Sequence, residues 1–320
     1  MTRPRTYLIS GATGSFGSAL AKHLLTTTPH HVRLLSRDEH KQERMQAVFP
    51  PNERTTYILC DIKDYERMEL AFHDADIVVH AAANKIVGQG ERHAQEFVKT
   101  NIYGTLNVIK ASIDNQVPKT LFISSDKAVS SVNFYGKTKA VAEGVFVSAN
   151  QYGRGSKFAC VRGGNVFGSR GSVIEKWLSA NPITVTDLDT TRFHLPMDYW
   201  LDFCLKSIDN MHGGEIFIPK CEAWSLRNLS NAFCAVYSDK SVNVTSPRAG
   251  DKKHETLISA YESEHTVDLK WGYVIEPSVE LRSVWDYQPH IGGKVDGEYG
   301  SDKVRQLAVD ELRTLISHTL

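Results

Sequence analysis

Residues 7–17 read Tyr-Leu-Ile-Ser-Gly-Ala-Thr-Gly-Ser-Phe-Gly, an apolar run that leads into three evenly spaced glycines. The pattern predicts a strand that ends at Ser10, followed by a helix over 15–25. Glycines at this spacing let the backbone turn tightly and approach a pyrophosphate, which then lies on the helix N-terminus. The glycine motif alone is a weak signal, but the strand–turn–helix context that it requires is also met. The segment predicts a dinucleotide site made by Gly11, Thr13, Gly14, Ser15, Phe16 and Gly17.

Further apolar runs follow at intervals typical of alternating strands and helices. Expected strands are 31–36, 56–60, 76–80, 120–124 and 158–162, and expected helices include 66–73, 94–115 and 135–150. This alternation predicts an α/β fold with a Rossmann-like, doubly wound parallel sheet.

The alternation breaks after Asn165, which indicates a second, smaller α/β unit. We expect residues 1–165 to bind the cofactor, with 187–210 returning to that domain, and residues 166–320 to form mainly the substrate domain. Its expected elements are short strands at 183–186, 215–219 and 242–245, a loop over 288–301 and a closing helix over 304–316.

Composition excludes several classes of protein. The 320 residues carry 37 Lys and Arg against 37 Asp and Glu, so no net charge favours nucleic acid or a membrane surface. The five cysteines are scattered and lack CxxC spacing, so we expect reduced, mostly buried thiols, no disulfide framework and no metal site. Without a signal peptide or an apolar run near the ~18 residues that span a bilayer, a cytoplasmic protein is expected.

The end of the second expected strand distinguishes between NAD and NADP. An acid there would bind a ribose 2′-hydroxyl, whereas this chain has Ser36 and Arg37, with Lys41 one helical turn further on. A guanidinium suits a 2′-phosphate through charge-assisted hydrogen bonds, so we favour NADP. Two readings stay open: Asp38 could face the ribose, and Arg37 and Lys41 could be ordinary surface charges.

Two more strand ends carry residues suited to a dinucleotide. Asp61 and Ile62 follow the third strand, where an acid can accept a hydrogen bond from an adenine amino group. Ala81, Ala82 and Ala83 follow the fourth strand, where small side chains let the backbone pass close to the cofactor. Each would alone indicate packing, but all lie at the carboxyl ends of successive strands.

Tyr135 and Lys139 have the YxxxK spacing, which places both side chains on one helix face. A lysine ~4 Å from the phenol contributes about 4 kcal/mol at an effective dielectric of ~20, or roughly three pK units. The spacing therefore predicts a tyrosine base whose pKa is lowered toward neutrality.

Ser125, Asp126 and Lys127 follow the fifth strand. The serine can hydrogen-bond a hydroxyl that is being oxidised, and the next two residues add an acid and a base at the same rim. An exposed turn with a local ion pair is the alternative.

With these residues in view, the chain resembles the inverting UDP-N-acetylglucosamine 4,6-dehydratases of the extended short-chain dehydrogenase/reductase family, which open pseudaminic-acid synthesis. The similarity covers roughly residues 6–280. Matching segments include 13–17, 36–39 with 41–42, 80–83 with Lys85, 99–102, 125–128, 133–136, 164–166, 168–174, 191–193, 212–217 and 250–255.

The resemblance implies NADP, a UDP-sugar and three chemical steps. Tyr135, helped by Lys139, takes the C4 hydroxyl proton while hydride passes to the cofactor. Lys127 then removes the C5 proton and Asp126 protonates the departing C6 hydroxyl, after which hydride returns to C6 and C5 is reprotonated on the opposite face. For these roles we expect burial beside cationic neighbours to lower the pKa of Lys127 and desolvation to raise that of Asp126.

The resemblance also implies contacts beyond the catalytic residues. Asn101 is expected at the cofactor. The expected substrate contacts are Lys85, Asn165, Ser172, Val173, Thr186, Arg192, Arg248, Asp251 and Glu255. Arg192 and Arg248 could instead be structural ion-pair partners, and Lys85 could merely line the cleft.

Several residues depart from the family pattern. Ser125 stands for a usual Thr, Asn84 for a usual Leu, and residues 88–91 change the loop after Lys85. Gly163 replaces a residue that is usually aromatic, so we expect a looser pocket there.

Three alternatives stay open: a retaining 4,6-dehydratase, a C4 epimerase acting on a UDP-hexosamine, and a non-catalytic NADP-binding regulator. The resemblance further implies a homo-oligomer, either a dimer or a hexamer.

Overall fold

A ten-stranded sheet forms the centre of the computed structural model, which describes residues 3–247, 249–285 and 287–319. Within these residues the strand order is β16-β14-β15-β10-β6-β5-β4-β1-β2-β3. The strands are β1 (Thr6–Ser10), β2 (His31–Ser36), β3 (Thr55–Leu59), β4 (Ile77–His80), β5 (Lys119–Ser125), β6 (Lys157–Gly163), β10 (Ile216–Ile218), β14 (Thr266–Asp268), β15 (Tyr273–Ile275) and β16 (Gly293–Lys294).

The order β3-β2-β1-β4-β5-β6 with parallel pairing is that of a Rossmann sheet, so the predicted fold class is confirmed. β10 extends the parallel part beside β6, whereas β15, β14 and β16 join antiparallel to their neighbours. Strands from beyond residue 165 thus complete the first sheet, and the division into a cofactor part and a substrate part stays a prediction.

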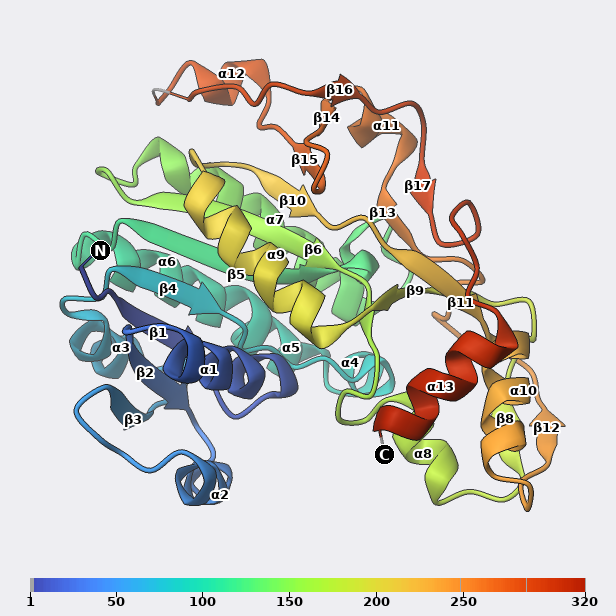
Figure 1. The fold of residues 1–320 in the computed structure, drawn as a ribbon. Coiled ribbons are helices and arrows are strands. Elements are labelled where there is room, and N and C mark those ends of the chain that lie inside the picture. The colour runs from blue at the N-terminus through green and yellow to red at the C-terminus, as the bar shows by residue number, and fades with distance from the viewer. Residues whose placement is uncertain (1–2, 248, 286, 320) are drawn as a thin grey trace.

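Helices cover both faces of the sheet. In Figure 1, α1 (Ser15–Thr27) and α9 (Met197–Asn210) lie side by side in front of it, while α6 (Gly104–Asp114) and α7 (Phe134–Ser148) lie behind. The remaining helical segments of this part are α2 (Glu39–Val48), α3 (Tyr65–Phe72), α4 (Val87–Arg92), α5 (Ala94–Phe97), η1 (Val98–Tyr103), η2 (Asp126–Ala128), η3 (Ala149–Gln151), α11 (Ala260–Ser263) and α12 (Val279–Arg282).

Alternation along the strands builds two cores. Ile9, Val79 and Val161 belong to the cluster that packs with α1 and α9, whereas Leu8 and Val78 belong to the cluster on the opposite face. Successive side chains of a strand point to opposite faces, so a strand buried on both faces reads as a continuous apolar run.

A smaller unit packs around its own core, which includes Trp177, Phe233 and Leu312. Its core takes buried residues from β8 (Ile183–Val185), β11 (Glu222–Ser225), α8 (Val173–Leu178), α10 (Leu226–Val236) and α13 (Val309–Thr319), and β12 (Val242–Val244) pairs with β8. The other short strands, β7 (Asn165–Val166), β9 (Thr191–Leu195), β13 (Thr256–Ile258) and β17 (Tyr299–Gly300), place hydrophobic residues in or against the cluster that contains Ile9.

Three predicted elements need correction. The expected loop over 288–301 contains the short strands β16 and β17. The closing helix starts at Val309 rather than at residue 304, because the backbone of Arg305 and Leu307 pairs with Ala223 of β11. The expected helix 94–115 is interrupted by a π-helical stretch over 98–103.

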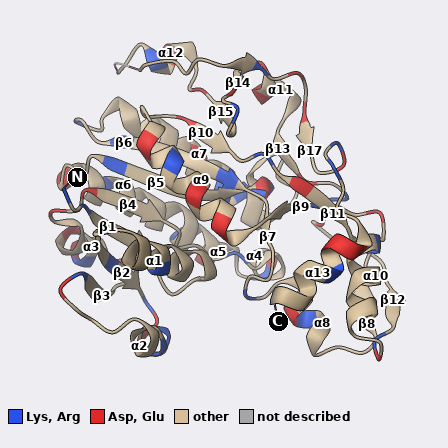
Figure 2. Cartoon of the chain, in the orientation of Figure 1, with Lys and Arg blue, Asp and Glu red and all other residues tan. Residues whose placement is uncertain are grey.

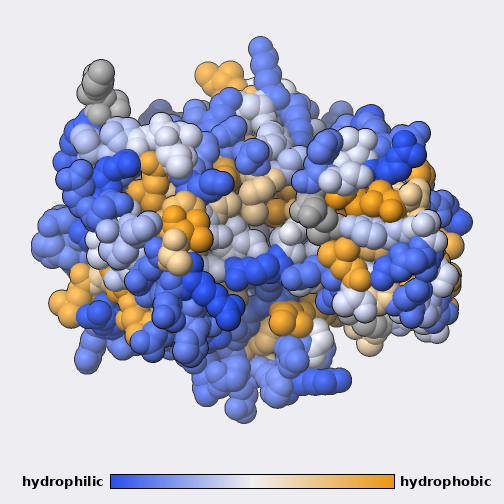
Figure 3. Space-filling model, turned by 60° about the horizontal axis from the view of Figure 1, so that its bottom comes forward, coloured by the Kyte–Doolittle hydropathy of each residue, from blue (hydrophilic) through white to orange (hydrophobic). Residues whose placement is uncertain are grey.

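The surface carries charges of both signs, in agreement with the equal numbers of basic and acidic residues. Figure 2 shows basic and acidic residues spread over elements of both units, and Figure 3 shows small hydrophobic patches among hydrophilic residues on one face. All five cysteines are free, and four of them are buried, as predicted. Within the described ranges, each helix is too short or too polar to traverse a lipid bilayer.

Candidate active site

A cleft of about 1440 Å³ lies between the carboxyl ends of β1–β6 and the smaller unit. Every predicted site residue in the described part of the chain lines it except Asn101. Arg248 lies outside the described residues. The residues brought together are Gly11, Thr13, Gly14, Ser15, Phe16, Gly17, Ser36, Arg37, Lys41, Asp61, Ile62, Ala81, Ala82, Ala83, Lys85, Ser125, Asp126, Lys127, Tyr135, Lys139, Asn165, Ser172, Val173, Thr186, Arg192, Asp251 and Glu255.

The glycine loop leaves room at the start of α1. Gly11 has a φ of +72°, and a Cβ there would lie 2.7 Å from the backbone nitrogen of Ala82. A Cβ on Gly17 would lie 2.5 Å from the carbonyl oxygen of Gly11, so only glycine allows this close packing. The N-cap residue Gly14 has no side chain to occupy the first amides of the helix, which suits an anion. These residues fit the pyrophosphate of a nicotinamide dinucleotide.

The end of β2 carries two cations in the cleft. Arg37 is more than half exposed, and its guanidinium lies 3.7 Å from the Asp61 carboxylate. Asp38 caps α2 by accepting the backbone N–H of Lys41, and its other oxygen lies 2.8 Å from the Lys41 ammonium. Both Asp38 oxygens are therefore engaged locally, and the half-exposed cations Arg37 and Lys41 remain at this rim.

Asp126 is the centre of a polar cluster in the cleft. One of its oxygens accepts hydrogen bonds from the Ser125 hydroxyl at 2.8 Å and from the Lys127 ammonium at 3.0 Å. Its other oxygen is buried and has no hydrogen-bond partner among the described residues. The exposed turn considered from the sequence is wrong, because Asp126 is only 1% exposed.

Lys127 contacts a second carboxylate, Glu255, at 3.3 Å. Burial alone would lower the pKa of Lys127, but the charges of Asp126 and Glu255 outweigh it, and the pKa is raised. The expected lowering of this pKa is wrong, because the nearest charges are acids rather than cations. Lys127 is thus an ammonium at neutral pH in this arrangement.

Tyr135 and Lys139 both lie on α7 and line the cleft, but the expected effect of one on the other is absent. Burial raises the pKa of Tyr135, and this outweighs the opposing Lys127 charge and the Ser125 hydrogen bond. Lys139 donates instead to the carbonyl oxygen of Ile123 at 2.7 Å and lies over the Phe122 ring. Burial lowers the pKa of Lys139 to about 7, against the opposing charge of Glu143.

The substrate side of the cleft carries its own polar groups. Arg192 donates to the carbonyl oxygens of Thr191 and Lys252, and its Nε lies 3.7 Å from Glu255. The side-chain oxygen of Asn165 is buried without a hydrogen-bond partner among the described residues. Burial, and next the Arg170 charge, lowers the pKa of Lys85, whose ammonium donates to the Arg170 carbonyl oxygen.

Comparison with known proteins shows which family the chain belongs to. The sequence profile of the polysaccharide biosynthesis protein family matches residues 7–277. The chain belongs to this family. A family relative from Campylobacter jejuni (serotype O:23/36, strain 81-176), named UDP-N-acetylglucosamine 4,6-dehydratase (inverting), is 39% identical over 100% of this chain and 99% of its own. The resemblance inferred from the motifs is thus confirmed.

Other similar proteins have different names. A relative from Rickettsia massiliae, named UDP-glucose 4-epimerase, is 32% identical over 98% of this chain and 95% of its own. The X-ray structure of Pen from Bacillus thuringiensis has a TM-score of 0.90 at 33% identity and covers 100% of this chain and 98% of that chain.

Asn101 has a different role from the expected cofactor contact. Its side chain accepts the backbone N–H of Asn84 and donates to the Asn84 carbonyl and to Thr138 of α7. All its hydrogen-bonding groups are satisfied inside the protein, so Asn101 braces the loop after β4 against the catalytic helix. Asn84, which departs from the family pattern, is its partner.

The cleft is also lined by residues that the sequence reasoning did not single out, among them Trp200 and Lys252. Lys252 lies 3.8 Å from Glu255 and donates to the Val129 carbonyl. Burial lowers the pKa of Lys252, against the opposing charge of Glu255. The sequence signal for Lys252 was its position within the 250–255 motif. The sequence signal for Trp200 was the small residue at position 163, which leaves space for a side chain from another element.

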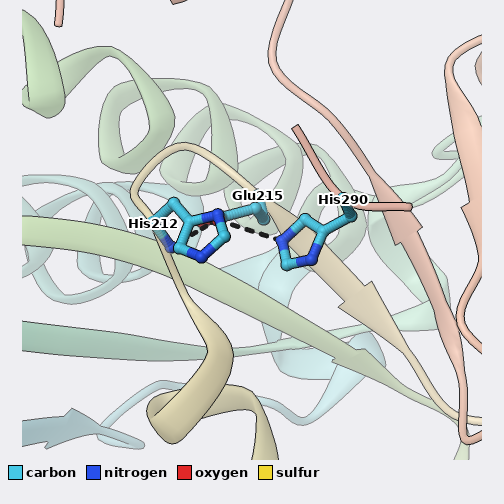
Figure 4. Close-up of side chains that lie close together, drawn as sticks. All are labelled: His212, Glu215 and His290. Carbon is cyan, nitrogen blue, oxygen red and sulfur yellow. Dashed lines mark hydrogen bonds and ion pairs between the residues drawn. The ribbon is translucent and has the colours of Figure 1, made fainter. Parts of the chain in front are cut away.

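A second polar cluster joins His212, Glu215 and His290 (Figure 4). The buried Glu215 carboxylate accepts the backbone N–H groups of His212 and Gly213, and the His290 ring lies 3.4 Å away. The two imidazole rings stack with planes only 10° apart. A shared metal ion would need a lone pair from each ring directed at one point, which parallel rings do not provide. The cluster is therefore better explained as a structural contact that holds His290 beside Glu215, just before β10.

Proposed function

We propose that this protein is an NADP-dependent UDP-N-acetylglucosamine 4,6-dehydratase that inverts C5. The observation that carries the proposal is the hydrogen-bonded group of Ser125, Asp126 and Lys127 in one cleft with Tyr135. A simple reductase would need only the hydroxyls and a lysine, whereas water elimination needs a second acid and base.

One proton distinguishes the observed state of Asp126 and Lys127 from the state that elimination requires. Moving a proton across the 3.0 Å between Lys127 Nζ and Asp126 turns the ion pair into a neutral amine and a carboxylic acid. The neutral amine can remove the C5 proton and the carboxylic acid can protonate the departing C6 hydroxyl. The pair therefore carries out both roles without a proton from solvent.

Each remaining group serves a defined atom of the sugar. Tyr135 accepts the C4 hydroxyl proton, and Ser125 orients that hydroxyl. When bound, the nicotinamide supplies a hydride acceptor for C4 and a hydride donor for C6. A proton from solvent reaches C5 on the face opposite to the one from which its proton left, and the proton that Tyr135 took from the C4 hydroxyl is released to solvent, which gives a UDP-2-acetamido-2,6-dideoxy-L-arabino-hex-4-ulose.

NADP is proposed over NAD because two half-exposed cations, Arg37 and Lys41, lie at the end of β2, whereas both oxygens of Asp38 are engaged by Lys41. A cytoplasmic location and assembly into a homo-oligomer stay predictions.

A C4 epimerase is the second candidate, because the Rickettsia massiliae relative carries that name. An epimerase has no use for an acid and a base at C5 and C6. A product that keeps the C6 hydroxyl would therefore favour it.

The test is incubation with UDP-N-acetylglucosamine and NADP⁺ in heavy water, followed by NMR of the product. We expect a 4-keto-6-deoxy sugar with deuterium and inverted configuration at C5. Lys127→Ala should still accumulate reduced cofactor, since C4 oxidation does not need the amine, but should release no water. Lys137→Ala, an exposed neighbour on α7, is the matched control and should behave as wild type. Normal dehydration by Lys127→Ala would refute the assignment.

A further inference from the structure

Gly163, at the carboxyl end of β6, faces an indole ring instead of open space. A Cβ built on Gly163 would lie 2.9 Å from two ring carbons of Trp200 and 3.1 Å from Leu195. Carbon atoms in proteins do not approach this closely, so no side chain fits while Trp200 holds its position. The looser pocket expected from Gly163 is therefore wrong, because an aromatic ring from another element takes the volume.

Trp200 reaches this point from α9, on the same face of the sheet as α1. Its side chain is 2% exposed, and its ring stacks on Phe203 with planes 11° apart. Its ring centroid lies 6.1 Å from that of Phe16, in the glycine loop. The indole is thus held from behind by the core, and both Trp200 and Gly163 line the cleft.

The sheet register places this ring near the reacting groups. Gly163 pairs with Ser125 on the neighbouring strand β5, so the indole edge lies one strand away from the catalytic hydroxyl. On its other side is Phe16, at the loop that fits the pyrophosphate. A dinucleotide whose pyrophosphate lies at the glycine loop and whose reacting ring lies near Ser125 would pass along this indole edge, since all four residues line the same cleft.

We propose that Trp200 is the positioning residue for the nicotinamide ring and supplies, from α9, the aromatic wall that Gly163 cannot supply from β6. This inference rests on the proposed use of a nicotinamide cofactor. A flat ring with two rotatable bonds, fixed by stacking, offers a rigid surface at low entropic cost. Because the aromatic ring comes from α9 instead of β6, the chain tolerates a glycine at the end of β6.

The inference predicts a selective loss of affinity for one half of the cofactor. The test is calorimetric titration of wild type and Trp200→Ala with NADP⁺ and with 2′-phospho-ADP-ribose, which lacks the nicotinamide. We expect Trp200→Ala to weaken NADP⁺ binding about tenfold and to change binding of the shorter ligand less than about twofold. If wild type binds NAD⁺ more tightly, NAD⁺ and ADP-ribose form the corresponding pair.

Two further variants keep the test decisive if Trp200→Ala is unstable. Ile208→Ala, a buried residue further along α9 and outside the cleft, should lower the melting temperature without changing the ratio of the two affinities. Trp200→Ala combined with Gly163→Phe should recover NADP⁺ affinity over Trp200→Ala alone, because the wall is restored from the strand. Equal losses for both ligands, no loss for either, or no recovery in the double variant would overturn the inference.

These titrations use no sugar nucleotide. A wild-type protein that fails to dehydrate UDP-N-acetylglucosamine would refute the proposed function and leave the affinity ratio readable. Conversely, an unchanged ratio in an active dehydratase would refute only the role of Trp200.

Discussion

Replacing Glu255 by Gln should move the pH dependence of turnover toward lower pH. Glu255 is 3% exposed, and one of its oxygens lies 3.3 Å from the Lys127 ammonium. The substitution keeps the size of the side chain and removes one negative charge. Because that charge favours the ammonium form, its loss lowers the pKa of Lys127. The proton that Lys127 and Asp126 share, which the elimination needs, is then lost to solvent at lower pH.

The size of the effect follows from Coulomb's law. At 3.3 Å and an effective dielectric of ~20, the attraction is about 5 kcal/mol, which is an upper bound of roughly 3.7 pK units. Arg192 and Lys252 lie within 3.8 Å of the same carboxylate and already neutralise part of it. We therefore expect the falling, high-pH limb of kcat to move down by at least about one pH unit.

The assay is the rate of water loss from UDP-N-acetylglucosamine at saturating substrate, measured from pH 5 to 10 for both proteins. Glu222→Gln, which removes a surface partner of Arg305, is the matched control and should leave the profile in place. Thermal unfolding should accompany the profile, because Gln leaves Arg192 and Lys252 beside Lys127 without their shared acid. A limb that stays in place or moves to higher pH would refute the reasoning.

Three other substitutions test separate parts of the structure. Tyr135→Phe should reduce turnover at least about a thousandfold with NADP⁺ affinity within about threefold, and retained turnover would exclude the phenol as base. Arg37→Ala should weaken NADP⁺ binding about tenfold or more and leave NAD⁺ binding nearly unchanged; equal losses would show that the guanidinium does not read the 2′-phosphate. Glu143→Gln should lower the free energy of unfolding by about 1–3 kcal/mol in urea titrations, because the buried Arg162 guanidinium loses its 2.7 Å partner but keeps Glu262 at 2.9 Å, and an unchanged free energy of unfolding would contradict that account.

The cofactor half of the fold was predictable because its signals are local. Each of β1–β6 is an apolar run whose ends the structure moves by at most one or two residues from the expected positions. The glycine loop and the YxxxK spacing likewise lie within a few residues of chain. Side chains placed at the ends of parallel strands then converge because the sheet aligns those ends.

The tail of the chain was predicted less well. β16 and β17 are two-residue strands, and their polar sequences indicate loops until β14 and β13 are beside them. Residues 304–308 have a helical pattern, but their backbone forms hydrogen bonds with Ala223 of β11, so α13 begins only at Val309. Such pairings join segments far apart in sequence, so no local pattern reports them.

The order of residues was enough to place Tyr135, Lys139, Asp126 and Lys127 at one sheet edge, since strand and helix periodicity depend only on near neighbours. Their protonation states were decided by the tertiary structure, which brings Glu255 to Lys127, turns Lys139 toward Ile123 and buries Tyr135. The same holds for Trp200, whose ring fills the space at Gly163 from another helix. Charge interactions and van der Waals contacts depend on distance in space, and that distance exists only after the chain has folded.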